Sequence, residues 1–367
     1  MRKILVLVAL LMLPLMGIRA HEDSEIQPII ALADGTIYAI SPEDGSARNL
    51  VEQSATAEFN LAIRAGALSP DGKQLVLVMQ NPYDTAPEQF KSEIVLVTIT
   101  DGSTEKIVPA GGVFDMPAGK GEIVDLSLPT WSYDGQRIYY FRKQYNPTST
   151  SRQSKPLLFA YYDVKSKKHE LVARIDPQNL IDNLQAVPEG MIIRLYKPGF
   201  NSVTTSTLYA YDNRVVQSIM RDPLHLYALR DGDQTDYAVL NNMGDINALI
   251  DATSGEERPA DVGYYPAARS RMTSEHSMNV FTVQTDVSVV YIYGEDELKA
   301  GTSFDNSYGF DYGLSPDGQE LAYLQFGEER QSPIRILDMQ GKTRELNFKA
   351  EQIMWGVEEF VLFPAPG

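Results

Sequence analysis

Leu68-Ser-Pro-Asp-Gly-Lys-Gln-Leu-Val-Leu-Val78, Trp131-Ser-Tyr-Asp-Gly-Gln-Arg-Ile-Tyr-Tyr-Phe141 and Leu314-Ser-Pro-Asp-Gly-Gln-Glu-Leu-Ala-Tyr-Leu324 follow one pattern, and that pattern decides the fold. In each stretch, a Ser-x-Asp-Gly turn precedes an apolar and aromatic run. Proline presets φ, aspartate bonds to its own backbone and glycine accepts a positive φ, so each turn favours a tight hairpin. Each stretch therefore predicts a hairpin turn that leads into a buried strand.

A second unit recurs between these stretches and contains an apolar or Tyr-rich strand, a polar turn and a strand that ends in Leu or Val. Its best copies lie at 34–50, 93–108, 157–172 and 334–346, and weaker copies lie at 207–219, 246–259 and 289–298. Degenerate copies of the first unit lie at 187–195, 226–240, 271–283 and 353–363. Hairpins that recur about every 50 residues, without a long amphipathic helix, are typical of a β-propeller.

The two kinds of hairpin predict the number of blades and the closure of the ring. With seven copies of each, we predict an all-β, seven-bladed β-propeller of four-stranded antiparallel blades, with six or eight blades as alternatives. The chain opens on an outer hairpin at 34–50 and ends on an inner hairpin at 353–363. We therefore expect the N- and C-terminal half-blades to pair, which would remove the exposed sheet edges.

The N-terminus has the layout of an export signal. Arg2 and Lys3 precede an apolar run from 4 to 16, and small residues before and at Ala20 favour cleavage there. The run is shorter than the roughly 20 apolar residues that a membrane-spanning helix needs, and no later stretch is long and apolar enough. We predict an extracytoplasmic (periplasmic or secreted) protein with a signal peptide at 1–20, a lead segment at 21–33, one propeller domain at 34–363 and a tail at 364–367.

Charge and composition exclude several classes of function. The formal net charge is -17 and the sequence contains no cluster of Lys and Arg, so nucleic acid is not expected as a partner. The absence of cysteine excludes disulfides, thiolate metal sites and cysteine nucleophiles. The hydrophobic fraction of 43% is sufficient for a folded core.

The Leu/Trp-Ser-Pro/Tyr-Asp-Gly turn with its following strand resembles the PD40, or WD40-like, repeat. This repeat occurs in TolB-type periplasmic propellers and in the propeller domains of prolyl-oligopeptidase-type peptidases. The clear motif covers three blades, and weaker copies extend the resemblance over most of 34–363. The resemblance implies a propeller but not an activity. Only 22–33 precede the first hairpin, and the chain ends soon after 363, so we expect neither the N-terminal α/β domain of TolB nor a hydrolase domain.

The residues that usually carry catalysis do not follow catalytic patterns. Ser315 lies in a repeat turn, so we expect it to be a turn residue and not a nucleophile. Acidic groups at 231–236 and 295–297 lack the calcium-loop spacing. No cofactor is predicted, and a calcium ion in the central channel would need ligands from different blades. The four histidines, none of which has metal-ligand spacing to another, are His21, His169, His225 and His276.

The connections on one face of the predicted propeller are long and carry aromatic side chains. In a four-stranded blade, the first–second and third–fourth turns lie on one face, which we call the short-turn face. The second–third connections and the links between blades lie on the other, the long-loop face. Long loops on a rigid scaffold are common binding sites. The candidate contact residues there are Tyr83, Tyr145 and Tyr308, and the loops also carry Phe90, Phe114 and Phe304.

Residues at the start of each innermost strand are expected to surround the central channel at the long-loop face. A mixed, mostly acidic ring at this mouth favours a cation or a basic peptide segment over an anion. The candidate mouth residues are Arg64, Asp125, Asp182, His225, Arg269 and Asp311.

Two functions are consistent with the sequence. The first is a secreted or periplasmic, non-enzymatic binding or scaffold module for a protein, peptide or glycan at the long-loop face. The alternative is a propeller-type, metal-dependent hydrolase or lactonase with its site at the central channel. Convergent carboxylates and an asparagine in the channel would favour the enzyme, and a channel without convergent ligands would favour the binding module.

Overall fold

The computed structural model describes the chain from residue 27 onwards, with gaps. The described ranges are 27–52, 62–81, 86–114, 121–146, 155–187, 190–197, 203–210, 215–218, 225–231, 234–240, 246–251, 257–259, 267–272, 277–282, 287–294, 297–305, 310–315, 320–325, 331–338, 342–355 and 361–362. Between 203 and 310 the description covers the backbone of the strands and the side chain of Tyr209. Across these ranges, no helix is long and apolar enough to cross a membrane. The predicted signal peptide at 1–20 lies outside them.

The regular elements in these ranges are all β-strands, and they form six four-stranded sheets and one five-stranded sheet. Four of the sheets contain the strands within 29–175 and 310–362. The N- and C-terminal strands together form β28 (Gln352–Met354), β1 (Ile29–Ala33), β2 (Thr36–Ile40) and β3 (Ala47–Glu52). The five-stranded sheet contains β29 (Val361–Leu362), β4 (Ala62–Leu68), β5 (Gln74–Gln80), β6 (Ser92–Thr98) and β7 (Thr104–Val108). The next contains β8 (Ile123–Trp131), β9 (Arg137–Tyr145), β10 (Leu157–Asp163) and β11 (Lys168–Ile175). The C-terminal sheet contains β24 (Phe310–Leu314), β25 (Glu320–Gln325), β26 (Ser332–Asp338) and β27 (Thr343–Ala350).

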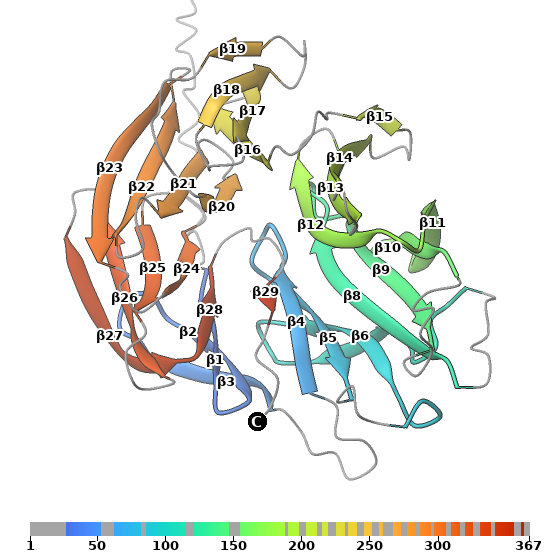
Figure 1. Ribbon diagram of the computed structural model, residues 1–367. Helices are drawn as coiled ribbons and strands as arrows, with labels where there is room; N and C mark the ends of the chain where they lie inside the picture. Colours follow the sequence, from blue (N-terminus) through green and yellow to red (C-terminus); the bar gives the residue numbers. More distant parts are fainter. Residues whose placement is uncertain are drawn as a thin grey trace, which may run out of the picture.

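Three further sheets lie between these in the sequence. They contain β12 (Leu180–Val187), β13 (Gly190–Lys197), β14 (Val203–Ala210) and β15 (Val215–Ser218); β16 (His225–Asp231), β17 (Gln234–Leu240), β18 (Ile246–Asp251) and β19 (Glu257–Pro259); and β20 (Ala267–Met272), β21 (Ser277–Thr282), β22 (Val287–Gly294) and β23 (Glu297–Asp305). Figure 1 shows the sheets following one another around a common centre, with β4, β8, β12, β16, β20, β24 and β28 innermost apart from the two-residue β29. This arrangement is a β-propeller.

The apolar core lies between the faces of successive sheets. On β5, Leu75 and Leu77 pack with the sheet that contains β1, while Val76 and Val78 pack with the sheet that contains β8. Both faces of the strand are therefore buried, which explains why its sequence is a continuous apolar run instead of an alternating one. Similar clusters join the β8 sheet to the β12 sheet and the β24 sheet to the β1 sheet.

The predicted Ser-x-Asp-Gly hairpin turns at 69–72 and 132–135 are confirmed, whereas residues 316–319 of the third lie outside the described residues. The Ser69 hydroxyl donates to Asp71 Oδ1 at 2.6 Å and accepts from the Gln74 amide at 2.9 Å. The corresponding bonds of Ser132, to Asp134 and from Arg137, have the same lengths. The Ser315 hydroxyl likewise accepts from the Glu320 amide at 2.9 Å, as expected for a turn residue. In these three turns the serine hydroxyl is thus a structural acceptor for the strand that follows.

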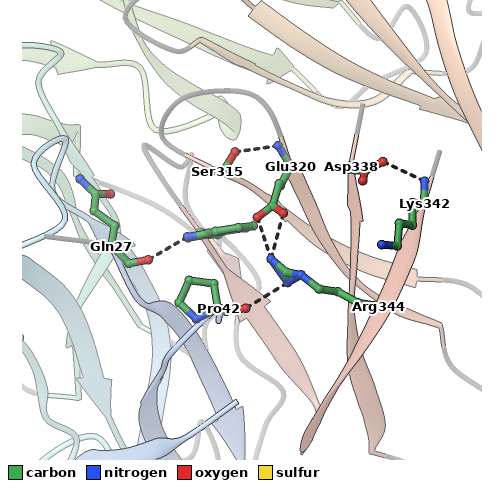
Figure 2. Close-up of polar contacts among 8 residues, drawn as sticks. Gln27, Pro42, Ser315, Glu320, Asp338, Lys342 and Arg344 are labelled. Atoms are coloured by element: carbon green, nitrogen blue, oxygen red, sulfur yellow. Dashed lines mark hydrogen bonds and ion pairs between the residues drawn. The ribbon is translucent and has the colours of Figure 1, made fainter. Parts of the chain in front are cut away.

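Arg344 links the C-terminal sheet to the next sheet of the ring. It is the second residue of β27, and its Nη2 donates to both carboxylate oxygens of Glu320 at 2.9 Å. Its Nη1 donates to the carbonyl of Pro42, in the turn between β2 and β3, at 3.0 Å. Figure 2 shows Arg344 between these two partners. The bidentate pair orients the guanidinium so that it can also reach the neighbouring sheet.

The second residue of the outer strand makes the same kind of link in the following two sheets. Arg48 of β3 donates to the carbonyls of Thr100, at 2.8 Å, and Ile99, in the turn after β6. Glu105 of β7 accepts from Lys167 Nζ, in the turn after β10, at 2.7 Å. The bonds to Thr100 and from Lys167 are exposed, whereas the bond from Arg48 to Ile99 is partly buried. Together they place a polar contact at the same short-turn position of three consecutive sheet interfaces.

The ends of the chain pair with each other, but not as two half-blades. Strand β28 pairs with β1, with Ala31 opposite Ile353, so three N-terminal strands and one C-terminal strand form one sheet. The extra N-terminal strand is β1, which lies in the segment expected to lead into the domain. The expected division of this sheet into two half-blades was wrong, because Asp34-Gly35 is the turn between β1 and β2. The apolar residues before this turn form a buried strand.

The predicted inner hairpin at 353–363 is also wrong. Its two halves belong to different sheets, since β28 pairs with β1 while β29 pairs with β4. Val361 lies opposite Gly66 and Leu362 opposite Ala65, which places β29 on the inner edge of β4 (Figure 1). The C-terminal strand therefore lies inside the ring, next to the innermost strand of another sheet.

We expect Ser132→Ala to destabilise the fold by about 1–2 kcal/mol, because the fully buried Ser132 hydroxyl is lost and the partly buried Arg137 amide loses its acceptor. Ser132 is fully buried, whereas Thr104, at the exposed start of β7, is a matched control. Thr104→Ala should stay within about 0.5 kcal/mol of the parent. Urea unfolding followed by circular dichroism measures both variants, and equal midpoints would contradict the structural role of the turn serine.

Candidate functional site

The best-defined polar site lies at the long-loop end of the interface between the β4 sheet and the β8 sheet. It contains Gly111 and Glu122 from the connection between β7 and β8, Arg142 and Gln144 from β9, and Lys155 from the connection between β9 and β10. We call these five residues the loop-base network. It joins the bases of two long connections to the end of one buried strand.

The hydrogen bonds of the loop-base network form a chain. Arg142 Nε and Nη2 donate to the Gly111 carbonyl at 3.3 and 3.2 Å, and its Nη1 donates to Gln144 Oε1 at 3.1 Å. Gln144 Nε2 donates to Glu122 Oε2 at 2.8 Å, and Lys155 Nζ donates to the same oxygen at 2.8 Å. The chain carries two cations and one carboxylate, so its formal charge is positive within an acidic protein.

Arg142 is buried because of its position on β9. Ile138 and Tyr140 on this strand pack into the core between the two sheets, and strand alternation directs Arg142 and Gln144 to the same face. Arg142 is 1% exposed, and its burial lowers the pKa of the guanidinium below its usual value. Gly112 makes room for it, because a Cβ there would lie 2.7 Å from Arg142 Nε.

A second set of contacts holds the same end of the interface. The Ser92 hydroxyl accepts from the Leu126 amide at 3.0 Å and donates to the Leu126 carbonyl at 3.4 Å, which joins β6 to β8. Lys106 Nζ lies 2.7 Å from Glu93 Oε2. Ser92 is fully buried and Glu93 is largely buried. The strand ends beneath the long loops are therefore fixed by polar contacts as well as by apolar packing.

One of the three predicted contact tyrosines is described. Tyr145 is the last residue of β9, is half-buried, and has Lys143 Nζ 4.8 Å from its ring centre. Its strand position places it on the opposite face of β9 from Arg142. Tyr83 and Tyr308 lie outside the described residues. Phe114, also on a long connection, packs against the core between the β4 and β8 sheets.

The six predicted mouth residues all lie near the start of an innermost strand, each in a different sheet. They are Arg64 on β4, Asp125 on β8, Asp182 on β12, His225 on β16, Arg269 on β20 and Asp311 on β24. The side chains of Asp182, His225 and Arg269 lie outside the description. A role in binding therefore stays a prediction for all six.

Two of these positions interrupt the strand pairing. The register between β4 and β5 shifts from Ile63 to Ala65, and the register between β12 and β13 shifts from Ile181 to Asn183. Arg64 and Asp182 are therefore bulge residues, and a bulge redirects a side chain relative to a regular strand.

Asp311 has a structural partner. Its Oδ2 accepts from the Ile353 amide at 2.9 Å, so it joins β24 to β28 across the interface between two sheets. Asp311 and Asp125 are both 7% exposed. Among the described residues, no group of three or more His, Asp and Glu side chains is arranged to hold a metal ion.

His169 lies in the interface between sheets. Its Nδ1 is 3.0 Å from the Tyr140 hydroxyl, and its ring lies against Tyr140 and Tyr162. Burial lowers the pKa of His169, and a backbone hydrogen bond with Ile107 opposes that shift. The imidazole therefore connects β9 and β11 with β7 and is not part of the loop-base network.

Sequence reasoning missed the loop-base network. The available signal was the pair of polar residues, Arg142 and Gln144, that continue the buried face of an otherwise apolar strand. The polar turns expected in the second unit at 34–50 and 93–108 are the Asp44-Gly45 and Asp101-Gly102 turns, where both glycines have a positive φ.

The chain matches no family model, and no curated protein matches it. Solved structures do match. A prolyl endopeptidase has 12% identity and a TM-score of 0.57 over 89% of this chain and 50% of its own, so the chain spans about half the length of that protein. The β-propeller domain of the Trilobed protease from Pyrococcus furiosus has 13% identity and a TM-score of 0.52, over 78% of this chain and 82% of that domain.

An oligogalacturonate lyase from Vibrio parahaemolyticus also matches, with 10% identity and a TM-score of 0.53 over 87% of this chain and 86% of the lyase. At these identities the likeness shows the fold alone. The predicted propeller is thus confirmed, while membership of the PD40 family stays a prediction. The comparisons include enzymes on this scaffold, so the fold does not decide between binding and catalysis.

We expect Arg142→Met to destabilise the protein by about 2–4 kcal/mol, because the Gly111 carbonyl and Gln144 lose a buried donor. Amide exchange should accelerate in the connection from 109 to 122. Lys167→Met is the matched control, because its ion pair with Glu105 has both side chains exposed, 63% and 49%, and its loss should cost less than about 1 kcal/mol. Unchanged exchange in Arg142→Met would show that the network does not hold the loop.

Proposed function

We propose that this chain is a non-enzymatic binding or scaffold module that recognises a protein, peptide or glycan on its long-loop face. The loop-base network carries the proposal. It fixes the bases of two long connections with partly buried hydrogen bonds, and loops on a rigid base lose less entropy on binding than free ones. In the turns on the opposite face, the serine and aspartate side chains bind each other and the backbone of their own turn.

The proposal includes the architecture and the location. Each of the sheets is one blade of a seven-bladed ring, closed by the pairing of β28 with β1. The chain is exported after removal of residues 1–20, and its working place is the periplasm or the exterior. The PD40-type repeat is the sequence form of these blades.

Tyr83, Tyr145 and Tyr308 are the proposed contact residues, and the mouth residues around the axis select the charge of the ligand. Tyrosine buries a large area at low entropic cost and retains a hydroxyl for hydrogen bonding. Lys143 beside the Tyr145 ring provides a cation next to an aromatic surface. This combination fits a polar polypeptide or a glycan better than an apolar small molecule.

The proposal is tested by affinity capture with the exported chain, residues 21–367, from an envelope extract, followed by binding measurements with each recovered protein and with a glycan array. A variant with Ala at Tyr83, Tyr145 and Tyr308 should lose at least tenfold in affinity. The control carries Ala at three exposed residues of the short-turn face, Glu43, Lys73 and Gln136, and should bind like the parent.

Equal loss in both triple variants, or no loss in either, would contradict the assignment of the long-loop face. A chain that binds no macromolecule, retains a divalent metal through dialysis and hydrolyses esters or lactones would instead support the metal-dependent alternative.

A further inference from the structure

His169 joins the outer strands of two neighbouring sheets. It is the second residue of β11, and its Nδ1 lies 3.0 Å from the Tyr140 hydroxyl of β9. The other partner of the ring is the backbone of Ile107, in β7 of the β4 sheet. Burial lowers the pKa of His169 and the Ile107 bond opposes this shift, as expected for a carbonyl that accepts a hydrogen bond from the imidazole. The ring therefore connects the outer strand of each sheet to the interface between them.

The hydrogen bonds of His169 are consistent with one protonation state, the neutral imidazole. Because Nδ1 faces Tyr140, we assign the N–H that binds the Ile107 carbonyl to Nε2. In the neutral ring Nδ1 is then an acceptor, so the Tyr140 hydroxyl is the donor. Burial raises the pKa of Tyr140, so this hydroxyl keeps its proton. The three groups thus form a chain in which each hydrogen bond has one donor and one acceptor.

A second proton on the ring breaks this arrangement. A proton taken up from solvent would reside on Nδ1, and both ring nitrogens would then be donors. Nδ1 would donate to the Tyr140 oxygen, and the hydroxyl proton of Tyr140 would need a different acceptor. Tyr140 is fully buried, and within the described part of the chain His169 is the partner of its hydroxyl. Protonation would therefore leave a buried donor without an acceptor, or separate the two side chains.

The charged groups nearest to this chain of hydrogen bonds neutralise each other. Glu105 of β7 pairs with Lys167 at 2.7 Å across the same interface, beside Tyr162, whose ring centre lies 5.0 Å from that of His169. Neither burial nor the Ile107 bond, which set the pKa of His169, involves a charged partner. The titratable and charged groups around the ring are Tyr140 and Arg142 of β9, Tyr162 and Asp163 of β10, Lys167 of the following turn, Glu105 of β7, and Lys168 and Glu170 of β11.

We propose that the neutral His169 imidazole is an acid-sensitive link between β7 and β11, and that mildly acidic solution breaks this link and loosens β7 at the outer edge of its sheet. Ile107 is followed four residues later by Gly111, whose carbonyl accepts from Arg142. The loosened strand therefore leads directly into the connection that the loop-base network holds. The link acts between the sheets and does not depend on what the long loops bind.

The test compares the parent with His169→Gln and with Lys167→Met, at pH values of about 7.5 and about 5. Glutamine offers an acceptor and a donor to the same two partners but does not titrate. Lys167→Met removes the exposed ion pair at the same interface and keeps the imidazole. Burial lowers the pKa of His169 in the folded chain, so the unfolded chain binds more protons below its usual pKa of about 6.5. Stability is therefore lost as the pH falls below that value.

On acidification, amide exchange of residues 104–111 and 168–175, corrected for intrinsic rates, should accelerate at least about threefold more in the parent and in Lys167→Met than in His169→Gln. The urea midpoint should also fall further in the first two chains. NMR titration of isotope-labelled histidine in the parent, with the His169 signal assigned by its contacts with Tyr140, should give a pKa below about 6.5. Equal pH dependence in all three chains would overturn the proposal. If His169→Gln does not fold, the titration of the parent decides, and a pKa at or above the usual value would overturn it.

Discussion

The fold depends on the pairing of β28 with β1, which brings residues from the two ends of the chain into one sheet. Three residue pairs form this ladder, among them Ala31 with Ile353. Without it, the β1 sheet would lose its innermost strand and the ring would have an open end on each side. The Asp311 carboxylate and the Trp355 indole add polar contacts at the same place, so the closure combines a ladder with side-chain bonds.

The polar groups on the two faces of the closed ring make different kinds of contact. On the short-turn face, Ser69 and Ser132 satisfy their own turns, and Arg344, Arg48 and Glu105 reach the next sheet. On the long-loop face, the buried polar groups lie at the strand ends and hold the bases of the connections. The loops above them are therefore the part of the molecule that can vary without loss of the fold.

The sequence was sufficient for the fold class because the same local physics recurs in each unit. Asp71-Gly72 and Asp134-Gly135 have one possible role, a tight turn, and the apolar strands that follow can only be buried. The role of Asp34-Gly35 was ambiguous, because a turn dipeptide alone does not show whether the residues before it form a strand of the same sheet. The structure resolves this by pairing β1 with a strand more than 300 residues away, and a local pattern contains no information about such a partner.

The candidate site was harder to predict for a similar reason. Tyr145 and the mouth residues were selected by their place in a repeat, and their strand positions follow from that repeat. The contact of Gln144 with Glu122 depends on the distance between a strand and a connection, which no spacing in the sequence encodes. The pairing of the C-terminal strand could not be predicted either. The sequence pattern indicated that Val361 and Leu362 form the second half of a hairpin, but they pair with β4.

The closure is tested most directly by a disulfide between Ala31→Cys and Ile353→Cys, because the chain has no cysteine of its own. Both residues lie in the same core cluster and directly oppose each other. We predict that this pair oxidises in the folded protein and raises its thermal midpoint, since the bridge closes a very long loop. The control pair, Ala31→Cys with Met354→Cys, places the second thiol on the opposite face of β28 and should stay reduced. A folded Ala31/Ile353 pair that oxidises no faster than the control would contradict the closure.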